Sequence, residues 1–368
     1  MKFTCTQENL LRGVSQVAPI AGRNAQLPIL QNILLQVQNN TLALTTTDLE
    51  IGIKTQIGGK MEEDGSCVLP AKRFMEYVQQ LPKTNPITLE KKEGKVFVTT
   101  KGFRAQFLSA DPEEYPLLPE NVKDDPITIN AKMFCGAISQ TIFSATREET
   151  RPEIRSVYIV WKDGGIHVAA TDSFRLAEYT AALQSSDDGV SLLLPLASAQ
   201  EVVRLFHEQE SIRIALYDNY VSFESGGIEL TSRLVDGKYP NYEDIIPTSH
   251  TTKIQIGRDD LLRALKTLSV FLPKESRRVS LEIRPVKGEV LLRVAGGDVG
   301  QGDVIISVEG EGEDVNVLVN IQYLIDGISH FSGDVCEGFF LGAFDPVVFR
   351  RQSKDDAYLY VIMPIQAQ

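Results

Sequence analysis

The chain has 368 residues, of which 43% are hydrophobic and 23% are charged, as in folded globular proteins and unlike disordered ones. Its formal net charge is 37 − 49 = −12, which counts against a domain that binds nucleic acid through an overall basic charge. No stretch approaches the roughly 20 consecutive apolar residues of a membrane helix. The first residues, Met1–Gln7, contain no apolar signal core.

The chain opens with a unit made of a short strand and an amphipathic helix. Residues 2–4 predict the strand, and Leu10, Val14 and Val17 follow at helical spacing. The same unit returns after residues 127–129 and after residues 254–256. The repeated apolar faces are Phe134, Ile138 and Thr141, and then Leu261, Leu265 and Leu268.

Short strands follow each of these helices. In the first third they are predicted at residues 34–37, 41–47 and 50–53, with Asn39-Asn40 at a turn because asparagine tolerates a positive φ. Corresponding strands are predicted at 156–162, 166–171 and 175–180 around the turn Asp163-Gly164-Gly165, and at 279–284, 290–295 and 304–308 around the turn at 287–289. The sequence therefore predicts a series of short paired strands in each third of the chain.

A second amphipathic helix in each third shows that the chain is an internal repeat. Phe74, Val78 and Leu81 form one face of the first such helix. Adding 125 to these positions gives Ala199, Val203 and Phe206, and adding 125 again gives Leu324, Ile328 and Phe331. Equal spacing of this kind indicates repeated domains.

The predicted fold class is α+β, with antiparallel sheets and two helices per repeat packed on one side. Boundaries near residues 123 and 251 give three domains, at 1–123, 124–251 and 252–368. The junctions between them, at 120–126 and 247–253, are short and polar. We therefore expect the domains to be docked rigidly.

Cysteine and histidine residues indicate neither a disulfide framework nor a metal site. Cysteine occurs singly and without a CxxC pair, at Cys5, Cys67, Cys135 and Cys336. Histidine is also isolated, without HxH or HExxH spacing, at His167, His207, His250 and His330. Idle thiols of a reducing cytoplasm are the simplest interpretation, and we expect no metal and no cofactor.

Two short motifs invite a catalytic or phosphate-binding interpretation but lack the required context. The glycines of Gly297-x-x-Gly300-x-Gly302 lead into a predicted strand, whereas a phosphate loop must lead into a helix N-terminus. Asp172-Ser173 is not surrounded by the Gly-x-Ser-x-Gly elbow of a serine nucleophile. The sequence therefore favours a protein without an active site.

Basic residues recur on the polar faces of the repeated helices and near the ends of the first helices. They are Arg12, Lys72, Arg73, Lys132, Arg204, Arg263 and Lys266 on the helices, with Arg23, Arg147, Arg151 and Arg277 in or near the loops. A solvated surface explains such residues equally well. Their recurrence on equivalent elements also suits a low-specificity surface for phosphates. Stacking aromatic residues do not accompany them, which argues against single-strand binding.

Several segments, in order along the whole chain, resemble the bacterial β sliding clamp of DNA polymerase III. They are Lys2–Thr4, Leu27–Asn32, Thr47–Glu50, Ala170–Ala177, Leu234–Tyr242 and Tyr360–Ile365. The resemblance implies a head-to-tail homodimer, in which two chains of three clamp domains form a ring with sheets outside and helices inside. It further implies a cytoplasmic, non-catalytic processivity factor of DNA replication that encloses double-stranded DNA without regard to its sequence.

The resemblance also implies protein partners and a place for them to bind. The partners are the DNA polymerase III alpha subunit, the clamp loader, and other polymerases and repair proteins that carry clamp-binding peptides. In the family, such a peptide enters an apolar pocket between the middle and last domains. The matching positions are Ile154, Thr171, Phe174, Arg175, Leu176, Pro240, Ile245, Asn320, Tyr323, Val361, Met363 and Pro364.

The chain departs from the family pattern at several of these places. Phe174 stands where a histidine is often found, and residues 365–368 replace a basic and apolar ending. Near the expected DNA surface, Glu148, Glu153 and Asp244 replace residues that are polar, aromatic or basic in some relatives. We therefore leave open which peptide is preferred and which DNA contacts form.

The ring implied by the resemblance needs a seam between protomers. The resemblance implies that Phe107 of one protomer contacts Phe271 and Leu272 of the other, which precede the polar residues 274–276. Two other classes of protein remain as alternatives: an enzyme that uses Asp172 and Arg175 at a domain junction, and a repeat protein with a purely structural role.

Overall fold

The computed structural model describes residues 1–23, 27–119, 126–183, 189–273, 277–297, 300–353 and 356–366. These residues form two compact units. Unit 1 comprises residues 1–135 and 201–234, and unit 2 comprises residues 136–200 and 235–368, apart from the residues not described. Each unit thus takes part of the middle third of the chain.

Unit 1 contains two antiparallel sheets. The first has the order β5 (Lys60–Glu63), β1 (Lys2–Cys5), β7 (Ile87–Lys92), β8 (Lys95–Thr100) and β9 (Phe103–Leu108). The second has the order β10 (Ile127–Asn130), β15 (Ser211–Leu216), β16 (Tyr220–Ser225), β17 (Ile228–Arg233), β4 (Ile51–Gly58), β3 (Thr41–Thr47), β2 (Asn32–Gln38) and β6 (Gly65–Pro70). The second sheet joins strands of the first and middle thirds through the pairing of β4 with β17.

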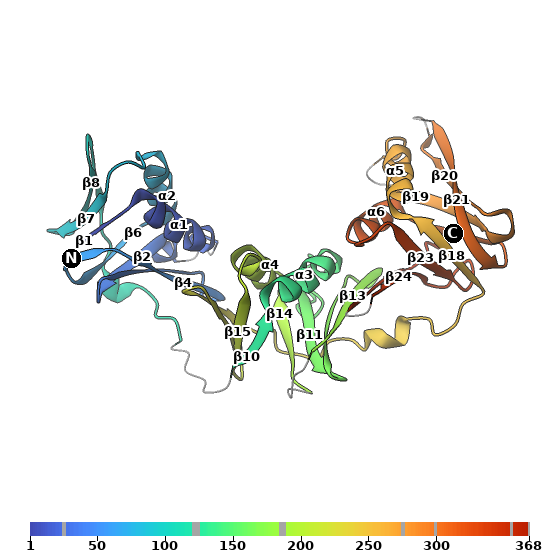
Figure 1. Ribbon diagram of the computed structural model, residues 1–368, viewed down its shortest axis with the longest axis horizontal. Helices are drawn as coiled ribbons and strands as arrows, with labels where there is room; N and C mark the ends of the chain where they lie inside the picture. Colours follow the sequence, from blue (N-terminus) through green and yellow to red (C-terminus); the bar gives the residue numbers. More distant parts are fainter. Residues whose placement is uncertain are drawn as a thin grey trace. The chain divides into compact units, whose positions relative to one another are not determined.

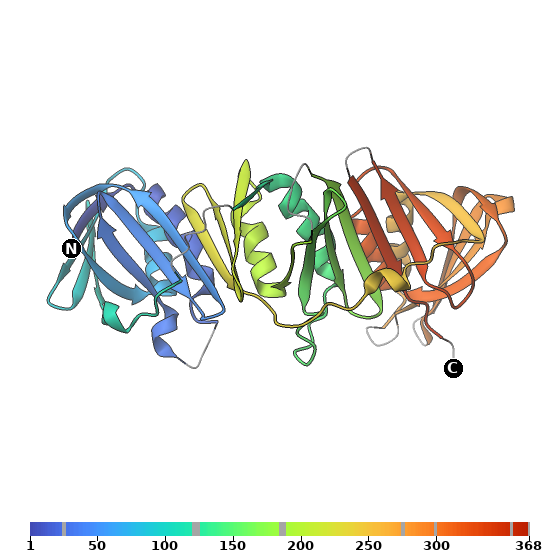
Figure 2. The same ribbon diagram turned by 90° about the horizontal axis from the view of Figure 1, so that it is seen from below.

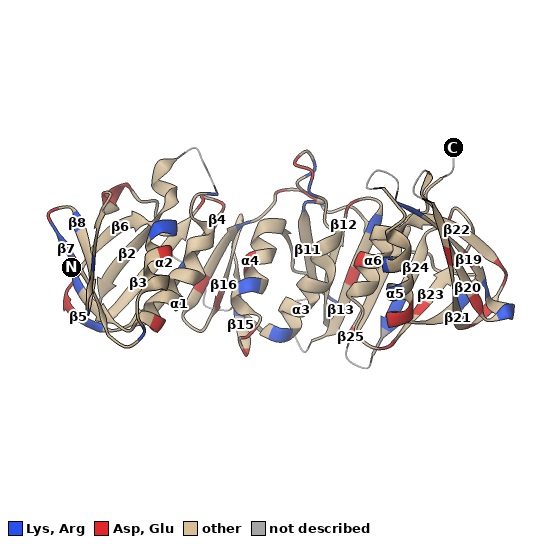
Figure 3. Cartoon of the chain, turned by 90° about the horizontal axis from the view of Figure 1, so that it is seen from above, with Lys and Arg blue, Asp and Glu red and all other residues tan. Residues whose placement is uncertain are grey.

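Unit 2 contains one antiparallel sheet that joins strands of the middle and last thirds. Its first half has the order β14 (Ser191–Pro195), β11 (Ser156–Lys162), β12 (Gly165–Thr171), β13 (Arg175–Ala182), β25 (Asp356–Ile362) and β24 (Val347–Gln352). Its second half continues with β23 (Val335–Phe340), β18 (Thr252–Gly257), β21 (Gln301–Gly312), β20 (Glu289–Ala295), β19 (Arg278–Arg284) and β22 (Val315–Asn320). Figure 1 labels most of these strands, and Figure 3 labels β12, β25 and β22.

Six α-helices of the described chain follow the predicted repeat. They are α1 (Gln7–Val17), α2 (Ala71–Gln80), α3 (Ala131–Thr141), α4 (Leu196–Phe206), α5 (Arg258–Ser269) and α6 (Ile321–Ser329). Because α2, α4 and α6 begin at residues 71, 196 and 321, the predicted spacing of 125 is confirmed. In unit 1, α1 and α2 cover one face of the sheets, and in unit 2, α5 and α6 do so (Figures 2 and 3).

The apolar faces of the helices are buried as predicted, with one exception. Phe74 and Val78 are fully buried, as are Leu324 and Ile328 in the last third. Val203 was predicted to complete the face of α4, but it is only partly buried, and Val202 takes the fully buried position. The prediction was wrong by one residue because Val202 and Val203 lie three and four positions after Ala199, and both spacings suit a helical face.

The tight turns have the backbone that their residues predict. Asn39 and Asn40 have φ angles of 51° and 59°, and Asp163 and Gly164 have φ angles of 55° and 69°. The glycine-rich segment that includes Gly297 leads into strand β21 rather than a helix. The predicted strand after these glycines is confirmed, so the segment lacks the helix N-terminus that a phosphate loop requires.

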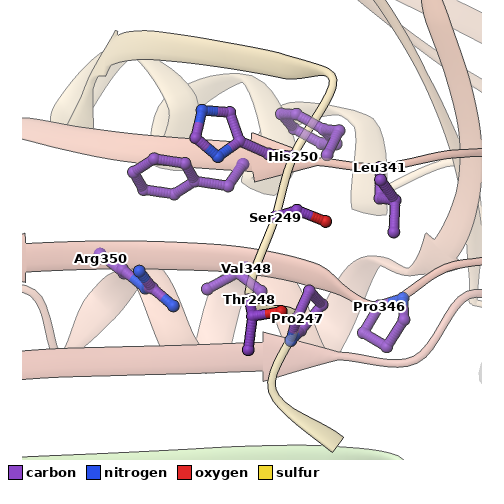
Figure 4. Close-up of a pocket in the computed structure, with 10 residues that line it drawn as sticks. Pro247, Thr248, Ser249, His250, Leu341, Pro346, Val348 and Arg350 are labelled. Carbon is purple, nitrogen blue, oxygen red and sulfur yellow. The ribbon is translucent and has the colours of Figure 1, made fainter.

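The junction between the middle and last thirds is bonded to the sheet of unit 2. The amide of Thr251 donates to the carbonyl of Phe340 at 2.9 Å, and the Thr252 hydroxyl donates to the carbonyl of Glu313 at 2.7 Å. Residues 247–250 line a pocket together with residues of β23, β24 and the loop between them (Figure 4). Its volume of about 30 Å³ leaves little free space beneath this segment. Residues 120–125 of the other junction lie outside the described residues.

No helix in the described ranges is long and apolar enough to cross a membrane.

Two helix glycines provide a test of the packing between α6 and the sheet. A Cβ atom at Gly327 would lie 2.0 Å from Cε1 of the buried Tyr360, whereas a Cβ atom at Gly136 in α3 would have no neighbour within 4 Å. Gly327→Ala should therefore lower the free energy of unfolding by about 1–3 kcal/mol or more, because the core is overpacked. Gly136→Ala should raise it by about 0.5–1 kcal/mol. Urea unfolding of both variants checks this, and equal effects would contradict the packing described here.

Candidate functional site

A loop with several internal hydrogen bonds connects β12 to β13 in unit 2. The Thr171 hydroxyl donates to the carbonyl of Arg175 at 2.7 Å and accepts from the amide of Ser173 at 3.1 Å. Oδ1 of Asp172 accepts from the amides of Phe174 and Arg175, both at 3.0 Å. Ser173 has a φ of 76°, in the left-handed region. These bonds fix the loop and leave the Phe174 side chain 61% exposed.

The Arg175 guanidinium, of which 12% is exposed, joins this loop to helix α6. Its Nε donates to Asp172 at 2.9 Å, and its Nη1 donates to Asp326 at 2.7 Å. Its Nη2 donates to the carbonyl of Phe143 at 2.9 Å, and its Cζ lies 4.5 Å from the centroid of the Tyr323 ring. A buried cation with two carboxylate partners is strongly destabilised when one partner is removed. The cluster therefore holds the loop, α6 and Tyr323 in a fixed arrangement.

Helix α6 presents two further predicted residues beside this cluster. Asn320 caps the helix by accepting from the amide of Gln322 at 2.9 Å. Gln322 donates to Asp326 at 2.7 Å, so the acid that binds Arg175 is itself held from within the helix. The Tyr360 hydroxyl donates to the carbonyl of Tyr323 at 2.8 Å, which bonds the helix to β25.

An apolar cluster lies beneath the loop. Leu176 and Val361 are paired residues of β13 and β25, and both are buried together with Ile154. After β25, the amide of Met363 donates to the carbonyl of Phe174 at 2.9 Å, which places Met363 and Pro364 beside the loop. We call the exposed and partly exposed residues around this cluster the second-junction surface. Its members are Phe174, Pro240, Ile245, Asn320, Tyr323, Met363 and Pro364.

The short helix η5 (Tyr242–Ile245) borders this surface and is anchored by an acid, Glu178, whose side chain is 13% exposed. The Tyr242 hydroxyl donates to Oε1 of Glu178 at 2.6 Å, and Nδ1 of His167 lies 3.3 Å from the same oxygen. Burial raises the pKa of Glu178, but hydrogen bonds from His167 and Tyr242 outweigh burial, so the pKa lies below its ordinary value. Ile245 is 40% exposed, and its neighbour Ile246 packs against the cluster instead.

Sequence reasoning missed the residues that hold this surface in place. Asp326 and Glu178 were not singled out, and His167 was set aside because it lacked metal-ligand spacing. Glu178 stands in an otherwise apolar stretch of β13, and such an interruption is a signal that a buried charge needs a partner. Asp326 lies four residues after Gln322, a spacing typical of helix-surface pairs.

The predicted DNA-facing cations fall into two groups. Five are exposed and form no ion pair with any other residue that the structure describes: Arg12, Lys72, Lys132, Arg147 and Lys266. The other six have partners within the chain. Arg73 pairs with Glu76, Arg263 with Asp260, Arg151 with Glu153 and Ser173, Arg277 with Gln322, and both Arg23 and Arg204 with Glu201. Figure 3 shows cations on the helices of both units.

Glu201 fixes the orientation of two of these cations, Arg23 and Arg204. Its side chain is 5% exposed, and it accepts from Nε of Arg204 at 2.6 Å while also pairing with Arg23. Arg204 further donates to the carbonyl of Gln16 at 2.6 Å. These two arginines are therefore fixed by unit 1 itself, and one buried carboxylate offsets part of their charge.

The predicted seam residues belong to different units. Phe107 lies on β9, an outer strand of its sheet, and its ring packs edge-on against Phe74 and Tyr77, each with a centroid separation of 5.8 Å. On the same strand, Phe103 is 48% and Leu108 is 71% exposed. In unit 2, Phe271 and Leu272 lie just after α5, beyond its C-cap Val270, and are partly buried. Residues 274–276, predicted to border the seam, lie outside the described residues.

Comparisons with known proteins cover almost the whole chain. Family models of the DNA polymerase III beta subunit match in order: the N-terminal domain at residues 1–119, the central domain at 128–241 and the C-terminal domain at 243–366. The beta sliding clamp of Synechococcus elongatus is 27% identical over 382 residues, covering 100% of this chain and 99% of that protein. That of Staphylococcus epidermidis is 26% identical over 378 residues, with the same coverage.

Solved structures give the same result. The DNA polymerase sliding clamp of Bacillus subtilis superposes with a TM-score of 0.95 at 26% identity, covering 100% of both chains. A sliding clamp of Bartonella birtlesii bound to griselimycin superposes with a TM-score of 0.94 at 25% identity, again covering 100% of both. The fold is therefore that of a clamp made of three α+β domains with antiparallel sheets. The chain belongs to the DNA polymerase III beta subunit family, which confirms the resemblance found in the sequence.

The partly buried Glu178 makes the stability of the fold depend on pH with a definite sign. Because its pKa is lowered by folding, the carboxylate stabilises the fold fully above the pKa of an unfolded glutamate, about 4.3, and this contribution is lost as the pH falls through the lower pKa of the folded chain. Glu178→Gln should thus be less stable than wild type at about pH 7, and the difference should shrink towards about pH 3. Urea unfolding across this range measures both, and a difference independent of pH would rule out a charged Glu178.

Proposed function

We propose that this chain is the processivity clamp of DNA replication, a ring-shaped cytoplasmic homodimer that encircles duplex DNA and tethers the replicative polymerase. The observation that carries the proposal is the ordered match of all three beta-subunit domains along the chain, together with the superposition on sliding-clamp structures. The division into domains 1–123, 124–251 and 252–368 is part of this proposal.

A head-to-tail dimer is supported by the edges of the sheets. Strand β9 ends one sheet of unit 1, and strand β22 ends the sheet of unit 2. Open edges of this kind are available for pairing with another chain. Exposed apolar side chains on β9 add an apolar contact of the kind found at interface cores. In the proposed ring, Phe107 of one protomer lies against Phe271 and Leu272 of its partner.

Enclosure explains how an acidic protein holds DNA. A closed ring does not depend on tight phosphate contacts, and strong contacts would oppose sliding. Arg12, Lys72, Lys132, Arg147 and Lys266 are the exposed cations proposed to attract phosphates without reading bases. The six partnered cations, among them Arg23 and Arg204, belong to the same proposed surface but are oriented by their partners.

The second-junction surface is the proposed docking site for peptides of polymerase, clamp-loader and repair partners. Its exposed side chains are mainly apolar and lie over a buried apolar cluster, as grooves for extended or helical peptides require.

The rival enzyme that uses Asp172 and Arg175 has no support in this geometry. Both carboxylate oxygens of Asp172 accept hydrogen bonds, and Arg175 is committed to three oxygen partners. We propose no catalytic activity.

The ring predicts that dimerisation depends on the seam. Replacing Phe271 and Leu272 together with alanine should give folded monomers, because the apolar contact across the proposed seam is lost. Analytical ultracentrifugation at dilute concentration measures the mass against twice the 40.8 kDa of the chain. Val286→Ala, which alters an 88% exposed apolar residue in the turn between β19 and β20, is the control and should stay dimeric. If the double variant stays dimeric, the seam does not lie at Phe271 and Leu272.

Peptide docking predicts a loss of affinity when Met363 is truncated. A peptide that carries glutamine and a Leu-Phe pair should bind Met363→Ala about tenfold more weakly, or by about 1–2 kcal/mol, because buried anchors dominate small interfaces. Met61→Ala, which alters a partly buried methionine of β5, should bind as wild type does. Titration calorimetry compares the three proteins. Equal affinities would place the peptide elsewhere.

A further inference from the structure

The loop between β3 and β4 in unit 1 repeats the peptide-site loop of unit 2 bond for bond. The Thr47 hydroxyl donates to the carbonyl of Ile51 at 2.9 Å and accepts from the amide of Leu49 at 3.0 Å. Oδ1 of Asp48 accepts from the amides of Glu50 and Ile51 at 3.0 and 2.7 Å. Leu49 has a φ of 78°, as Ser173 has a φ of 76°. The two loops are 124 residues apart in the sequence.

The neighbouring strand continues the match. The amide of Arg233 donates to the carbonyl of Glu50 at 2.9 Å, which is the bond that Met363 makes to Phe174 at the same distance. Gly52 pairs with Thr231 across β4 and β17, as Leu176 pairs with Val361 across β13 and β25. The backbone beside the proposed peptide site is therefore present a second time, within unit 1.

In unit 1, a leucine from a different chain segment takes the place of Leu176, the buried leucine beneath the loop of unit 2. Gly52 occupies the position of Leu176 and has no side chain, but a Cβ atom there would lie 2.2 Å from Cδ2 of Leu118. Leu118 thus lies directly on the glycine and fills the space that Leu176 fills in unit 2. Tyr115, buried just before it, is bonded to the sheet by its hydroxyl, which donates to the carbonyl of Asn32 at 3.1 Å.

A groove with a volume of about 370 Å³ remains open beside Leu118, within the roughly 300–1,000 Å³ of typical ligand pockets. We call it the first-junction groove. Its lining includes Leu49, Leu117, Leu118, Tyr220, Thr231 and Arg233. Leu49 is 43% exposed and Leu117 is 87% exposed, so apolar surface is available to an incoming side chain.

The charges of the first-junction groove distinguish it from the second-junction surface. Arg233 and Glu50 stand where unit 2 has Met363 and Phe174. Nη1 of Arg233 lies 3.7 Å from Oε1 of Glu50, beyond hydrogen-bond distance, and the two side chains are 60% and 67% exposed. Such an exposed pair contributes little. A carboxylate that accepts two parallel hydrogen bonds from the guanidinium therefore makes a better partner for Arg233 than Glu50 does.

We propose that the first-junction groove is a second peptide-binding site, which takes an extended acidic segment of a partner protein. A leucine-sized side chain of that segment contacts Leu49 and Leu117, and an adjacent carboxylate replaces Glu50 on Arg233. The class of occupant, an extended peptide, rests on the proposed function of the second-junction surface. The preference for an acidic peptide rests on Arg233 alone.

The test uses the full-length protein with labelled leucine, isoleucine and valine methyl groups and the blocked peptide Ac-Asp-Leu-Gly-Leu-Gly-amide. We expect saturable methyl shifts at Leu49, Leu117 and Leu118. Arg233→Ala should weaken binding roughly tenfold, and Glu50→Gln should tighten it, because the competing carboxylate is removed. Arg213→Ala is the matched control, because Arg213 forms a similar cross-strand pair with Glu224 at 3.4 Å in the same sheet and should leave binding unchanged.

A peptide with lysine in place of aspartate tests the proposal without any change to the protein and should not bind. Equal binding of the two peptides, unchanged affinity in Arg233→Ala, or shifts confined to Ile245 and Val361 would overturn the proposal. A glutamine and Leu-Phe peptide, titrated into the same sample, reports separately on the second-junction surface through the Val361 methyl groups. Failure of either site is thus distinguished from failure of the other.

Discussion

Strand pairing across the boundaries between repeats is the constraint that positions both proposed peptide sites. In unit 2, residues 175–181 of the middle third pair with residues 356–362 at the end of the chain. In unit 1, β4 of the first third pairs with β17 of the middle third. Without these partners each strand would present a row of unbonded amides and carbonyls. The pairing fixes the loop before β4 beside the end of β17, and the loop before β13 beside the end of β25. Each proposed site lies at this meeting point of a loop and a strand end.

Largely buried charges hold the meeting point in unit 2 in place. Arg175 is held by two carboxylates and a carbonyl, and Glu178 by a tyrosine and a histidine. Desolvation makes such groups costly unless every one of them is paired, so each group orders the element that supplies its partner. The same physics acts at Glu201, which holds Arg23 and Arg204 in fixed orientations. Internal acids therefore hold some of the cations in place, whereas others form no ion pair with any residue that the structure describes.

The helices and strands were predictable because their signals are local. Periodicity placed Phe74 and Leu324 correctly, and asparagine and glycine placed the turns. The family and its fold were predictable because the motifs recur in order along the whole chain. The partners of Arg175 were not predictable, because Asp326 is 151 residues away and only the folded sheet brings the two together. The assignment of particular residues to DNA and to the peptide stays a prediction.

The repeated loops show which part of a binding site is fixed by the backbone and which part is free to differ. Thr47-Asp48 and Thr171-Asp172 make the same hydrogen bonds, because a threonine hydroxyl and an aspartate carboxylate satisfy the amides of this turn wherever it occurs. Side chains that point away from the turn make none of these hydrogen bonds, so they are free to differ between the two loops. Phe174 is accordingly replaced by Glu50, and the leucine floor of one copy comes from β13 while that of the other comes from Leu118. A duplicated scaffold can therefore keep its geometry while its chemistry changes from apolar to charged.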